Sequence, residues 1–503
     1  MKLSHLRKIH FIGIGGAGVS GLARIAIQSG IQVSGSDMVE SDFTRELIPL
    51  GATIHVGHHR DNVPADASLT VISAAIRPEN HEYRESGRLG IRIMKYAEAL
   101  GEITRSFTNL CIAGTHGKTT TSAMLAQIML EAKKQPGWLV GGEPVSLPAA
   151  SAAGRGKHFV MESCEYDRSF MQLFPNVIVL NNIELDHMDV YGDINGLVSG
   201  FIDFAKKLPT HGLLIYNADD EHCRKAAAKA GCHAVGFGES KDADWRLCDL
   251  DASNGFARGL VKYRGMTVGT MQLEVPGRVN AINALGALAA ANWAGVPTRQ
   301  ALQSLQNFRG VKRRFEVLGS IGGVPLVDDY AHHPTAVEQL LRTARRTFKG
   351  RNIIAVFQAH QYQRILQFHD EFAENLKLAD RVLIARTYAA REKGVIPGEP
   401  EDRLARKLRD SGVSAMAYSD FESIRSDIAI KSTPRDVVIF IGAGDVNEIG
   451  YDLIRERTFV SARLRALKEA KESHRLKQII SRPDTRAGSE RHFNTVAPDT
   501  GAA

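Results

Sequence analysis

Residues 113–122, AGTHGKTTTS, form a stretch whose residue types suit the binding of nucleotide phosphates. The apolar residues 109–113 predict a strand before it and residues 119–131 predict a helix after it, which is the context of a P-loop. There, Lys118 can reach the β- and γ-phosphates and Thr119 can offer its hydroxyl to Mg²⁺. The spacing is shorter than in the standard GxxxxGKT pattern, because Ile112 stands where the first glycine would be. ATP binding is the favoured interpretation of this loop.

A second glycine-rich loop lies much earlier in the chain, where Gly13, Gly15 and Gly18 match the GxGxxG pattern. Residues 8–12 predict a strand before the loop, residues 20–29 predict a helix after it, and Asp37 ends the next predicted strand. Such glycines let the backbone approach a diphosphate, which the helix N-terminus can hold. The pattern does not choose between NAD and a UDP-sugar, and a glycine-rich turn that binds nothing also remains open.

Glu162 and His187 are candidate metal ligands, since each follows a predicted strand. The carboxyl ends of parallel strands form the edge where open α/β sheets bind ligands. The carboxylate of Glu162 is a suitable hard-oxygen ligand for Mg²⁺. An imidazole is an unusual ligand for Mg²⁺, so His187 taken alone is better interpreted as a surface or packing residue.

The apolar pattern predicts three successive segments in which strands alternate with helices, as in parallel sheets with helices on both faces. Residues 243–274, which are more polar and punctuated by glycine, predict antiparallel hairpins, and the alanine-rich residues 280–294 predict a helix. The other predicted strands are residues 32–35, 69–73, 91–93, 159–161, 177–180, 213–216, 325–327, 353–357, 381–384 and 437–441.

The length and charge of the chain limit the number of domains and the kinds of partner that can be expected. At 503 residues the chain is too long for one core, so about two to four domains are expected. The net charge is +7, and Lys and Arg crowd residues 455–491, so the rest is nearly neutral. A basic tail could touch nucleic acid or an anionic membrane, but a solvated helix is the favoured interpretation, and no nucleic-acid partner is expected.

The cysteine spacing and the apolar content indicate the cellular compartment of the protein. The five cysteines include no CxxC pair, and no run of about 18 apolar residues occurs. We therefore expect a cytoplasmic protein without membrane insertion.

Six motifs together resemble those of the Mur ligases of bacterial cell-wall synthesis, over about residues 8–460. Residues 13–21, GIGGAGVSG, are similar to that family's UDP-binding loop, and residues 113–121 are similar to its form of the ATP loop, which has the same short spacing. The other four motifs are residues 182–189 (NIELDHMD), 313–316 (RRFE), 328–334 (DDYAHHP) and 442–445 (GAGD). They occur in the family's order, which makes the resemblance highly specific.

The resemblance implies an α/β fold of three domains. These would be an N-terminal Rossmann-like UDP-binding domain (residues 1–106), a central P-loop ATPase-like domain (107–316) and a C-terminal Rossmann-like, amino-acid-binding domain (317–460). A basic helical and then disordered tail (461–503) would follow. The implied reaction is the ATP-dependent ligation of L-alanine to the lactyl carboxylate of UDP-N-acetylmuramate through an acyl phosphate, in peptidoglycan precursor synthesis. A monomer or homodimer is expected.

The resemblance also assigns roles to individual residues by motif. The catalytic residues would be Lys118, Glu162, His187, Arg314, Asp328 and His332. ATP would be bound by Gly114, Thr115, His116, Gly117, Lys118, Thr119, Thr120, Asn280 and Asn283. One Mg²⁺ would be bound by Thr119 and Glu162, and His187 would help to bind a second near the acyl phosphate. The UDP-sugar would be bound by Gly13, Gly15, Gly16, Gly18, Asp37 and Ser73. The amino acid would be bound by His360 and Arg364, and His333 would line the same cleft.

Three positions depart from the family pattern. Val279 stands where a histidine usually precedes Asn280, Cys164 replaces an acid, and Gln361 replaces an arginine in the amino-acid segment. The last change leaves open a ligase of the same mechanism that adds another amino acid or a recycled peptide. An NAD-dependent oxidoreductase would leave the ATP loop unexplained. A non-catalytic UDP-sugar sensor is disfavoured, because the ATP-loop and metal candidates are all retained.

Overall fold

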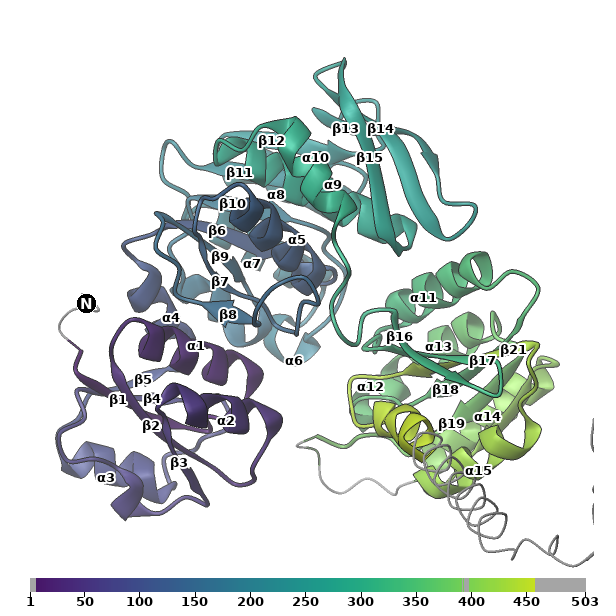
Figure 1. Ribbon diagram of the computed structural model, residues 1–503, viewed down its shortest axis with the longest axis horizontal. Helices are drawn as coiled ribbons and strands as arrows, with labels where there is room; N and C mark the ends of the chain where they lie inside the picture. Colours follow the sequence, from purple (N-terminus) through teal and green to yellow (C-terminus); the bar gives the residue numbers. More distant parts are fainter. Residues whose placement is uncertain (1–5, 391, 393–397, 457–503) are drawn as a thin grey trace, which may run out of the picture. The chain divides into compact units, whose positions relative to one another are not determined.

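A computed structural model describes residues 6–390, 392 and 398–456 of the chain. Met1–Gly450 form one compact unit, and its strands make three separate sheets of five, ten and six strands (Figure 1). The predicted tail, residues 461–503, lies outside the described residues. In the described part of the chain, no helix has the length and apolar character needed to cross a membrane.

The first sheet is parallel throughout and has the strand order β3-β2-β1-β4-β5. Its strands are β1 (Lys8–Ile12), β2 (Gln32–Asp37), β3 (Thr53–Val56), β4 (Leu69–Ile72) and β5 (Ile93–Lys95). The helices are α1 (Ala17–Gln28), α2 (Asp42–Leu47), α3 (His81–Arg88) and α4 (Tyr96–Thr104). The strand order reverses between β1 and β4, which is where open α/β sheets form a ligand-binding crevice.

The second sheet has the order β15-β14-β13-β12-β11-β10-β6-β9-β7-β8. Its strands are β6 (Thr108–Ala113), β7 (Gly137–Leu139), β8 (Ser151–Ala152), β9 (His158–Glu162), β10 (Val177–Leu180), β11 (Leu213–Asn217), β12 (Ala234–Gly238), β13 (Trp245–Asp251), β14 (Phe256–Tyr263) and β15 (Met266–Pro276). The helices are α5 (Lys118–Glu131), α6 (Met188–Tyr191), α7 (Ile194–Ala205), α8 (Glu221–Ala230), α9 (Arg278–Trp293) and α10 (Thr298–Gln306). Strands β13, β14 and β15 are antiparallel, which confirms the predicted hairpins.

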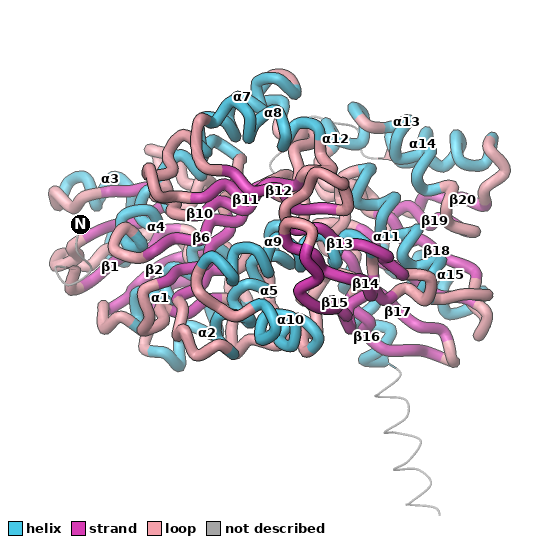
Figure 2. Tube along the Cα trace, turned by 90° about the horizontal axis from the view of Figure 1, so that it is seen from above, coloured by secondary structure: helices cyan, strands magenta, loops and turns pink. Residues whose placement is uncertain are grey.

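The third sheet has the order β16-β17-β21-β18-β19-β20. Its strands are β16 (Glu316–Ile321), β17 (Val324–Asp329), β18 (Asn352–Phe357), β19 (Arg381–Ile384), β20 (Ser414–Ala417) and β21 (Asp436–Ile441). Strands β16, β17, β18, β19 and β20 are labelled in Figure 2. The helices are α11 (Pro334–Thr347), α12 (Tyr362–Gln367), α13 (His369–Leu376), α14 (Glu399–Asp410) and α15 (Phe421–Lys431). The apolar run of β21 is buried along its whole length, as expected of a central parallel strand that is covered on both faces.

The three-sheet α/β architecture confirms the predicted fold class. The strand predicted at residues 91–93 is displaced and forms Ile93–Lys95 instead. Strands β3, β7, β8, β12, β16 and β20 were not predicted. Of these, β3 and β20 are short edge strands whose residues are partly exposed and weakly apolar. The predicted domain boundaries at residues 106, 316 and 460 stay predictions.

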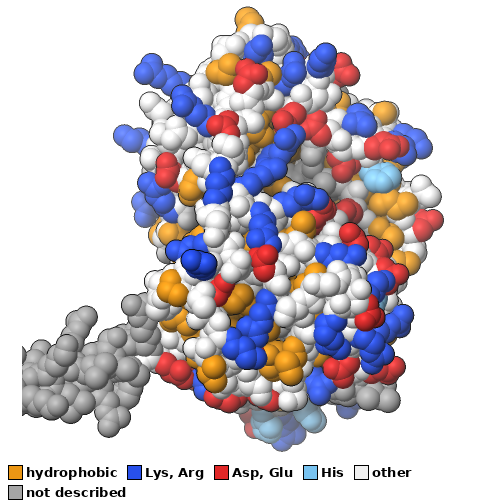
Figure 3. Space-filling view, turned by 90° about the vertical axis from the view of Figure 1, so that its right-hand side faces the viewer, with side chains coloured by type: hydrophobic (Ala, Val, Ile, Leu, Met, Phe, Trp, Pro, Cys, Tyr) orange, Lys and Arg blue, Asp and Glu red, His pale blue; other side chains and the backbone are white. Residues whose placement is uncertain are grey.

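Charged side chains of both signs are interspersed on the face drawn in Figure 3. Many surface charges of the third domain are paired. Lys407 Nζ lies 2.5 Å from Asp370, and Arg345 lies 2.8 Å from Asp380. Such exposed pairs contribute little to stability.

Candidate active site

The glycine loop after β1 is held by residues at the ends of β2 and β4. Gly13 has a φ of +79° and a Cβ there would lie 2.6 Å from the Oγ of Ser73, so only glycine fits. The Gly15 N–H donates to Asp37 Oδ2 at 2.8 Å, and a Cβ at Gly18 would lie 2.9 Å from the ring of Tyr96. The structure therefore brings the predicted UDP-sugar residues together, with Asp37 also bracing the loop.

The start of α1 directly follows this loop. Gly16 is the N-cap residue, and no side chain caps the described helix. Backbone N–H groups at an uncapped N-terminus can bind a diphosphate. The binding role of these residues stays a prediction.

The ATP loop joins β6 to α5 and packs tightly on two asparagines. Gly117 has a φ of +79°, and a Cβ there would lie 2.5 Å from Asn283 Oδ1 and 3.0 Å from Asn181 Nδ2. Asn283, which is 4% exposed, is thus placed beneath the loop. Asn280 donates to the carbonyl of Pro276 at 2.7 Å. The predicted contact of Asn280 and Asn283 with adenine stays a prediction.

The segment after β10 supports the same loop from the other side. The N–H of Thr115 donates to the carbonyl of Asn182 at 3.1 Å, and the N–H of His116 donates to Asn182 Oδ1 at 2.8 Å. A Cβ at Gly114 would lie 2.9 Å from the carbonyl oxygen of Asn182. Asn182, the first residue of the NIELDHMD stretch, therefore supports the backbone of the loop.

Lys118 lies at the centre of the loop and is paired with an acid that the sequence analysis missed. Its Nζ donates to the carbonyl of Gly114 at 2.5 Å, to that of Thr115 at 3.1 Å, and to the Glu165 carboxylate at 2.9 and 3.0 Å. Burial lowers the pKa of Lys118, but the Glu165 carboxylate outweighs it, so the pKa is raised. The only signal for Glu165 was a second acid shortly after Glu162 in MESCEYD.

The predicted Mg²⁺ ligands Thr119 and Glu162 flank one pair of glycines. A Cβ at Gly141 would lie 2.6 Å from Glu162 Oε2, and a Cβ at Gly142 would lie 3.2 Å from Thr119 Cγ2. The lack of a Cβ at these glycines therefore lets the loop approach the Glu162 carboxylate and the methyl group of Thr119, and the Gly141 N–H donates to Glu162 Oε1 at 2.8 Å. Hydroxyl and carboxylate oxygens are suitable ligands for Mg²⁺, so these residues fit the ion.

His187 lies on the other side of Glu165. Its Nε2 is 3.9 Å from Glu165 Oε1, and its ring centroid is 5.0 Å from that of Tyr166. His187 has a φ of +54°, a conformation uncommon for residues with a Cβ. Lys118, Glu165 and His187 thus form a contiguous row of charged and polar side chains.

In the third domain, Asp328 is fully buried against Arg313. The guanidinium Nε of Arg313 lies 3.3 Å from the carboxylate, and Arg313 also donates to the carbonyls of Gly442 and Gly444 at 2.8 and 2.9 Å. Burial raises the pKa of Asp328 to about 7, although Arg313 opposes the shift. The neighbouring Arg314, predicted to reach phosphate, lies 4.8 Å over the ring of Tyr330.

A second buried group of polar residues contains the predicted amino-acid ligands. Arg364 donates to Asp186 Oδ1 at 2.7 Å. Burial and the nearby Arg364 guanidinium lower the pKa values of His332 and His360, that of His360 to about 4. His332 Nδ1 lies 3.0 Å from the carbonyl oxygen of Tyr330. A carbonyl only accepts, so Nδ1 carries the proton and Nε2 carries the lone pair.

Gln361 has an unusual backbone conformation beside this group. Its φ is +74°, and its N–H donates to the carbonyl of Tyr388 at 2.8 Å. The ring of Tyr388 stacks on that of His360 with centroids 5.6 Å apart. Tyr388 also borders a cavity of about 300 Å³. The other residues that line the cavity are Gln358, Arg386, Thr387, Ala389, Ser419, Asp420, Phe421 and Asp445.

Family models match most of the chain in three consecutive parts. Residues 8–108 match "Mur ligase family, catalytic domain", residues 112–291 match "Mur ligase middle domain", and residues 313–444 match "Mur ligase, glutamate ligase domain".

Two curated relatives carry one name, UDP-N-acetylmuramate–L-alanine ligase. The protein from Clostridium novyi is 39% identical over 447 residues, which cover 88% of this chain and 96% of the relative. The protein from Chlorobaculum tepidum is 37% identical over 453 residues, which cover 89% of this chain and 95% of the relative.

Two solved structures are similar over nearly their whole length. The UDP-N-acetylmuramate–alanine ligase of Thermotoga maritima has a TM-score of 0.77 at 28% identity and covers 90% of this chain and 99% of its own. A murein peptide ligase of Psychrobacter arcticus has a TM-score of 0.67 at 25% identity, and the match covers 89% of this chain and 98% of that ligase.

Proposed function

The chain belongs to the Mur ligase family, and on that premise we propose that it joins L-alanine to the lactyl carboxylate of UDP-N-acetylmuramate, using ATP. The observation that carries the proposal is the 39% identity to a relative of that name over 96% of the relative's length. The product is a precursor of peptidoglycan, and we place the enzyme in the cytoplasm, where its nucleotide substrates are made.

The chemistry explains why one chain has two phosphate-binding loops. A carboxylate does not react with an amine at a useful rate, because oxide is a poor leaving group. Transfer of the γ-phosphoryl group of ATP to the lactyl carboxylate gives an acyl phosphate, from which phosphate leaves when the amine attacks. The first loop would hold the UDP of the sugar, and the loop at Lys118 would hold ATP.

The first step brings two anions together, so it requires charge neutralisation and alignment. Lys118 would bind the β- and γ-phosphate oxygens from its position above the loop carbonyls, 2.5 Å from that of Gly114. Thr119 and Glu162 would hold one Mg²⁺ and His187 would help to hold a second, and these ions supply further positive charge at the phosphates when bound. Glu165 must release Lys118 before the phosphates can take its place.

The second step requires a bound amino acid with a free, deprotonated amine. Arg364 would bind its carboxylate through charge-assisted hydrogen bonds. The Nδ1 of His332 faces the carbonyl of Tyr330, which leaves the lone pair on Nε2, so we propose that Nε2 accepts the amine proton.

A same-mechanism ligase for a larger amine is the second candidate. Gln361 offers only a neutral amide in the amino-acid segment, and a cavity of about 300 Å³ borders Tyr388, whose ring stacks on that of His360. A peptide ligase is also among the similar structures.

Phosphate release separates the two candidates. The assay would use UDP-N-acetylmuramate and ATP with L-alanine, L-serine, glycine or an L-alanyl peptide in turn. L-alanine is expected to give the highest kcat/KM. A higher value with the peptide would favour the second candidate, and no release with any amine would contradict both.

A further inference from the structure

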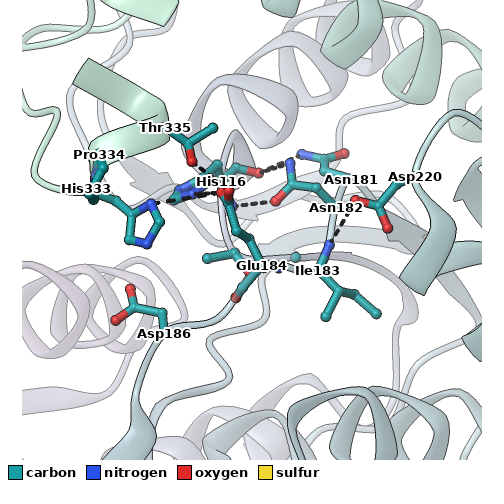
Figure 4. A network of polar contacts seen from close by, with 12 residues as sticks. His116, Asn181, Asn182, Ile183, Glu184, Asp186, Asp220, His333, Pro334 and Thr335 are labelled. Atoms are coloured by element: carbon teal, nitrogen blue, oxygen red, sulfur yellow. Dashed lines mark hydrogen bonds and ion pairs between the residues drawn. The ribbon is translucent and has the colours of Figure 1, made fainter. Parts of the chain in front are cut away.

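Three side chains from distant parts of the chain meet beside the ATP loop. His116 belongs to that loop, Glu184 follows β10, and His333 directly precedes α11 of the third domain. Figure 4 shows His116, Glu184 and His333 directed toward one another. We call these three residues the His–Glu–His cluster.

The distances within this cluster are short. His116 Nε2 lies 2.8 Å from Glu184 Oε2, and His333 Nδ1 lies 3.7 Å from the same oxygen. One donor atom from each residue lies within 4.8 Å of the other two. Donors that share one Zn²⁺ are about 3.3 Å apart when the bonds are about 2.0–2.1 Å long. Small side-chain shifts would therefore bring all three onto one ion.

His333 is available as a ligand. It is 4% exposed, and neither ring nitrogen has a hydrogen-bond partner among the described residues. A buried polar group without a hydrogen-bond partner lowers the stability of the fold, and a bound ligand would supply the missing partner of this side chain. Burial, with His116 nearby, lowers the pKa of His333 to about 4, so the ring is neutral at pH 7, as a metal ligand must be.

Glu184 is held in position by a neighbour outside the cluster. The hydroxyl of Thr335 donates to Glu184 Oε1 at 2.5 Å, which leaves Oε2 directed at the two histidines. Burial raises the pKa of Glu184, but hydrogen bonds from His116 and Thr335 outweigh this, so the pKa is lowered and the group is a carboxylate. Ligating carboxylates in metal sites are commonly oriented by such a second hydrogen bond.

We propose that His116, Glu184 and His333 form a binding site for a divalent transition-metal ion, with Zn²⁺ as the best match. Two imidazole nitrogens and one carboxylate oxygen are the ligand set that Zn²⁺ and its neighbours in the transition series prefer, whereas Mg²⁺ prefers oxygen alone. With three protein ligands, a tetrahedral ion would take water as its fourth ligand. None of the three residues is a predicted Mg²⁺ ligand, so the site is additional to that of Mg²⁺.

An ion at this site would tie the ATP loop to the third domain. His116 and Glu184 lie in the segments that shape the loop, while His333 lies at the N-terminus of α11. The bound ion would therefore restrain both parts at once.

The test measures Zn²⁺ binding by the full chain without an affinity tag, after a chelator has removed bound metal. Competition with a chromophoric chelator gives the affinity, and metal analysis after gel filtration gives the stoichiometry. The variants are His333→Ala and Glu184→Gln. The second variant nearly preserves the shape of the side chain and removes its charge. The control is His59→Ala, which removes an exposed histidine 3.3 Å from Asp61. Thermal unfolding checks that each variant folds.

The wild-type chain and His59→Ala are expected to bind about one Zn²⁺ each. Changing only an outer-shell partner of a ligand costs about 10–100-fold in affinity, so losing a ligand should cost about a hundredfold or more in both cluster variants. Unchanged affinity in a folded cluster variant would place the ion elsewhere and overturn the proposal. Absence of Zn²⁺ binding to the wild-type chain would also overturn the proposal, and the cluster would then be a hydrogen-bonded contact between side chains.

Co²⁺ provides a measurement that does not depend on any variant. Added to the wild-type chain, it should give the intense visible absorption of a four-coordinate ion, and an equal amount of Zn²⁺ should abolish that absorption. The weak spectrum of a hydrated six-coordinate ion would contradict the site even if every variant failed to fold.

Discussion

Arg364 donates a hydrogen bond of 2.7 Å to Asp186, and the two side chains are only 9% and 10% exposed. The pair connects α12 of the third domain with the segment that precedes α6 of the central domain. Burial opposes ionisation of Asp186, but Arg364 outweighs it and holds the pKa of Asp186 well below its ordinary value. The guanidinium that we assign to the substrate therefore already has an anionic partner.

The first prediction concerns Arg364. Removing a guanidinium that pairs with a charge in a closed site costs about 2–5 kcal/mol. Arg364→Ala should therefore raise the KM for L-alanine about a hundredfold or more, and leave the KM for ATP within a few-fold. The control is Arg345→Ala, which removes a surface arginine of the same domain. Normal L-alanine kinetics in folded Arg364→Ala would mean that the amino acid binds elsewhere.

The second prediction concerns Gln361. A neutral amide holds a carboxylate less well than a guanidinium does, so Gln361→Ala should change the KM for L-alanine much less than Arg364→Ala does. Gln361→Arg should lower it. Both residues carry a Cβ, so the exchange adds no new cost at the φ of +74°. Steady-state kinetics with L-alanine, glycine and L-serine checks this, and a raised KM in Gln361→Arg would count against the assignment.

The third prediction concerns Lys118. Loss of a clamp on the γ-phosphate should lower kcat by about a thousandfold or more. Lys118→Ala should still bind UDP-N-acetylmuramate almost normally, because the other glycine loop belongs to a different sheet. Phosphate release measures the first effect and calorimetric titration measures the second. Near-normal release would remove Lys118 from the proposed mechanism.

The fourth prediction concerns Glu165, which competes with phosphate for the same ammonium group. Glu165→Gln should tighten ADP binding several-fold when Mg²⁺ is left out, since a neutral amide is displaced more easily than a carboxylate. Glu143→Gln is a matched control, because Glu143 pairs with Lys312 at an exposed site. Calorimetric titration gives the Kd values, and weaker ADP binding in Glu165→Gln would show that the acid helps to hold the nucleotide.

The fifth prediction concerns pH and Asp328. Its pKa is raised from 3.8 to about 7, so the folded chain binds this proton more tightly than the unfolded chain does. The resulting stability is fully present below about pH 4 and is lost as the pH rises through about 7, by at most about 1.4 kcal/mol per pH unit. Asp328→Asn stays neutral, so its melting temperature relative to wild type should rise between pH 5 and about pH 8. A constant difference would contradict the raised pKa.

Much of the fold and part of the candidate site could be predicted from the sequence, because buried strands and the residues that follow them leave a recognisable pattern. Apolar runs such as residues 177–180 and 437–441 are buried on both faces, and this leaves a clear pattern in the sequence. The polar residues that follow such strands must lie at one edge of a sheet. Gly13 and Ser73, which follow different strands, therefore meet as expected.

Other parts of the site leave no local pattern. Glu165 faces Lys118, and His333 faces Glu184, only because the tertiary fold brings these segments together. Asn283 lies in an alanine-rich helix, and nothing in that sequence indicates that its amide supports Gly117. Contacts between segments far apart in the chain cannot be derived from periodicity, which describes one segment at a time.

The pairing of Glu165 with Lys118 also bears on which anions the loop can take up. An empty loop with an unpaired lysine would attract any small anion, and inorganic phosphate is abundant wherever ATP is used. With the carboxylate in place at 2.9 Å, an incoming anion must outweigh a negative charge that is already bound. A triphosphate carries enough charge and enough further contacts to do so, whereas a single free phosphate has few of either. With ATP as the proposed ligand, the acid would therefore give the loop selectivity against small anions.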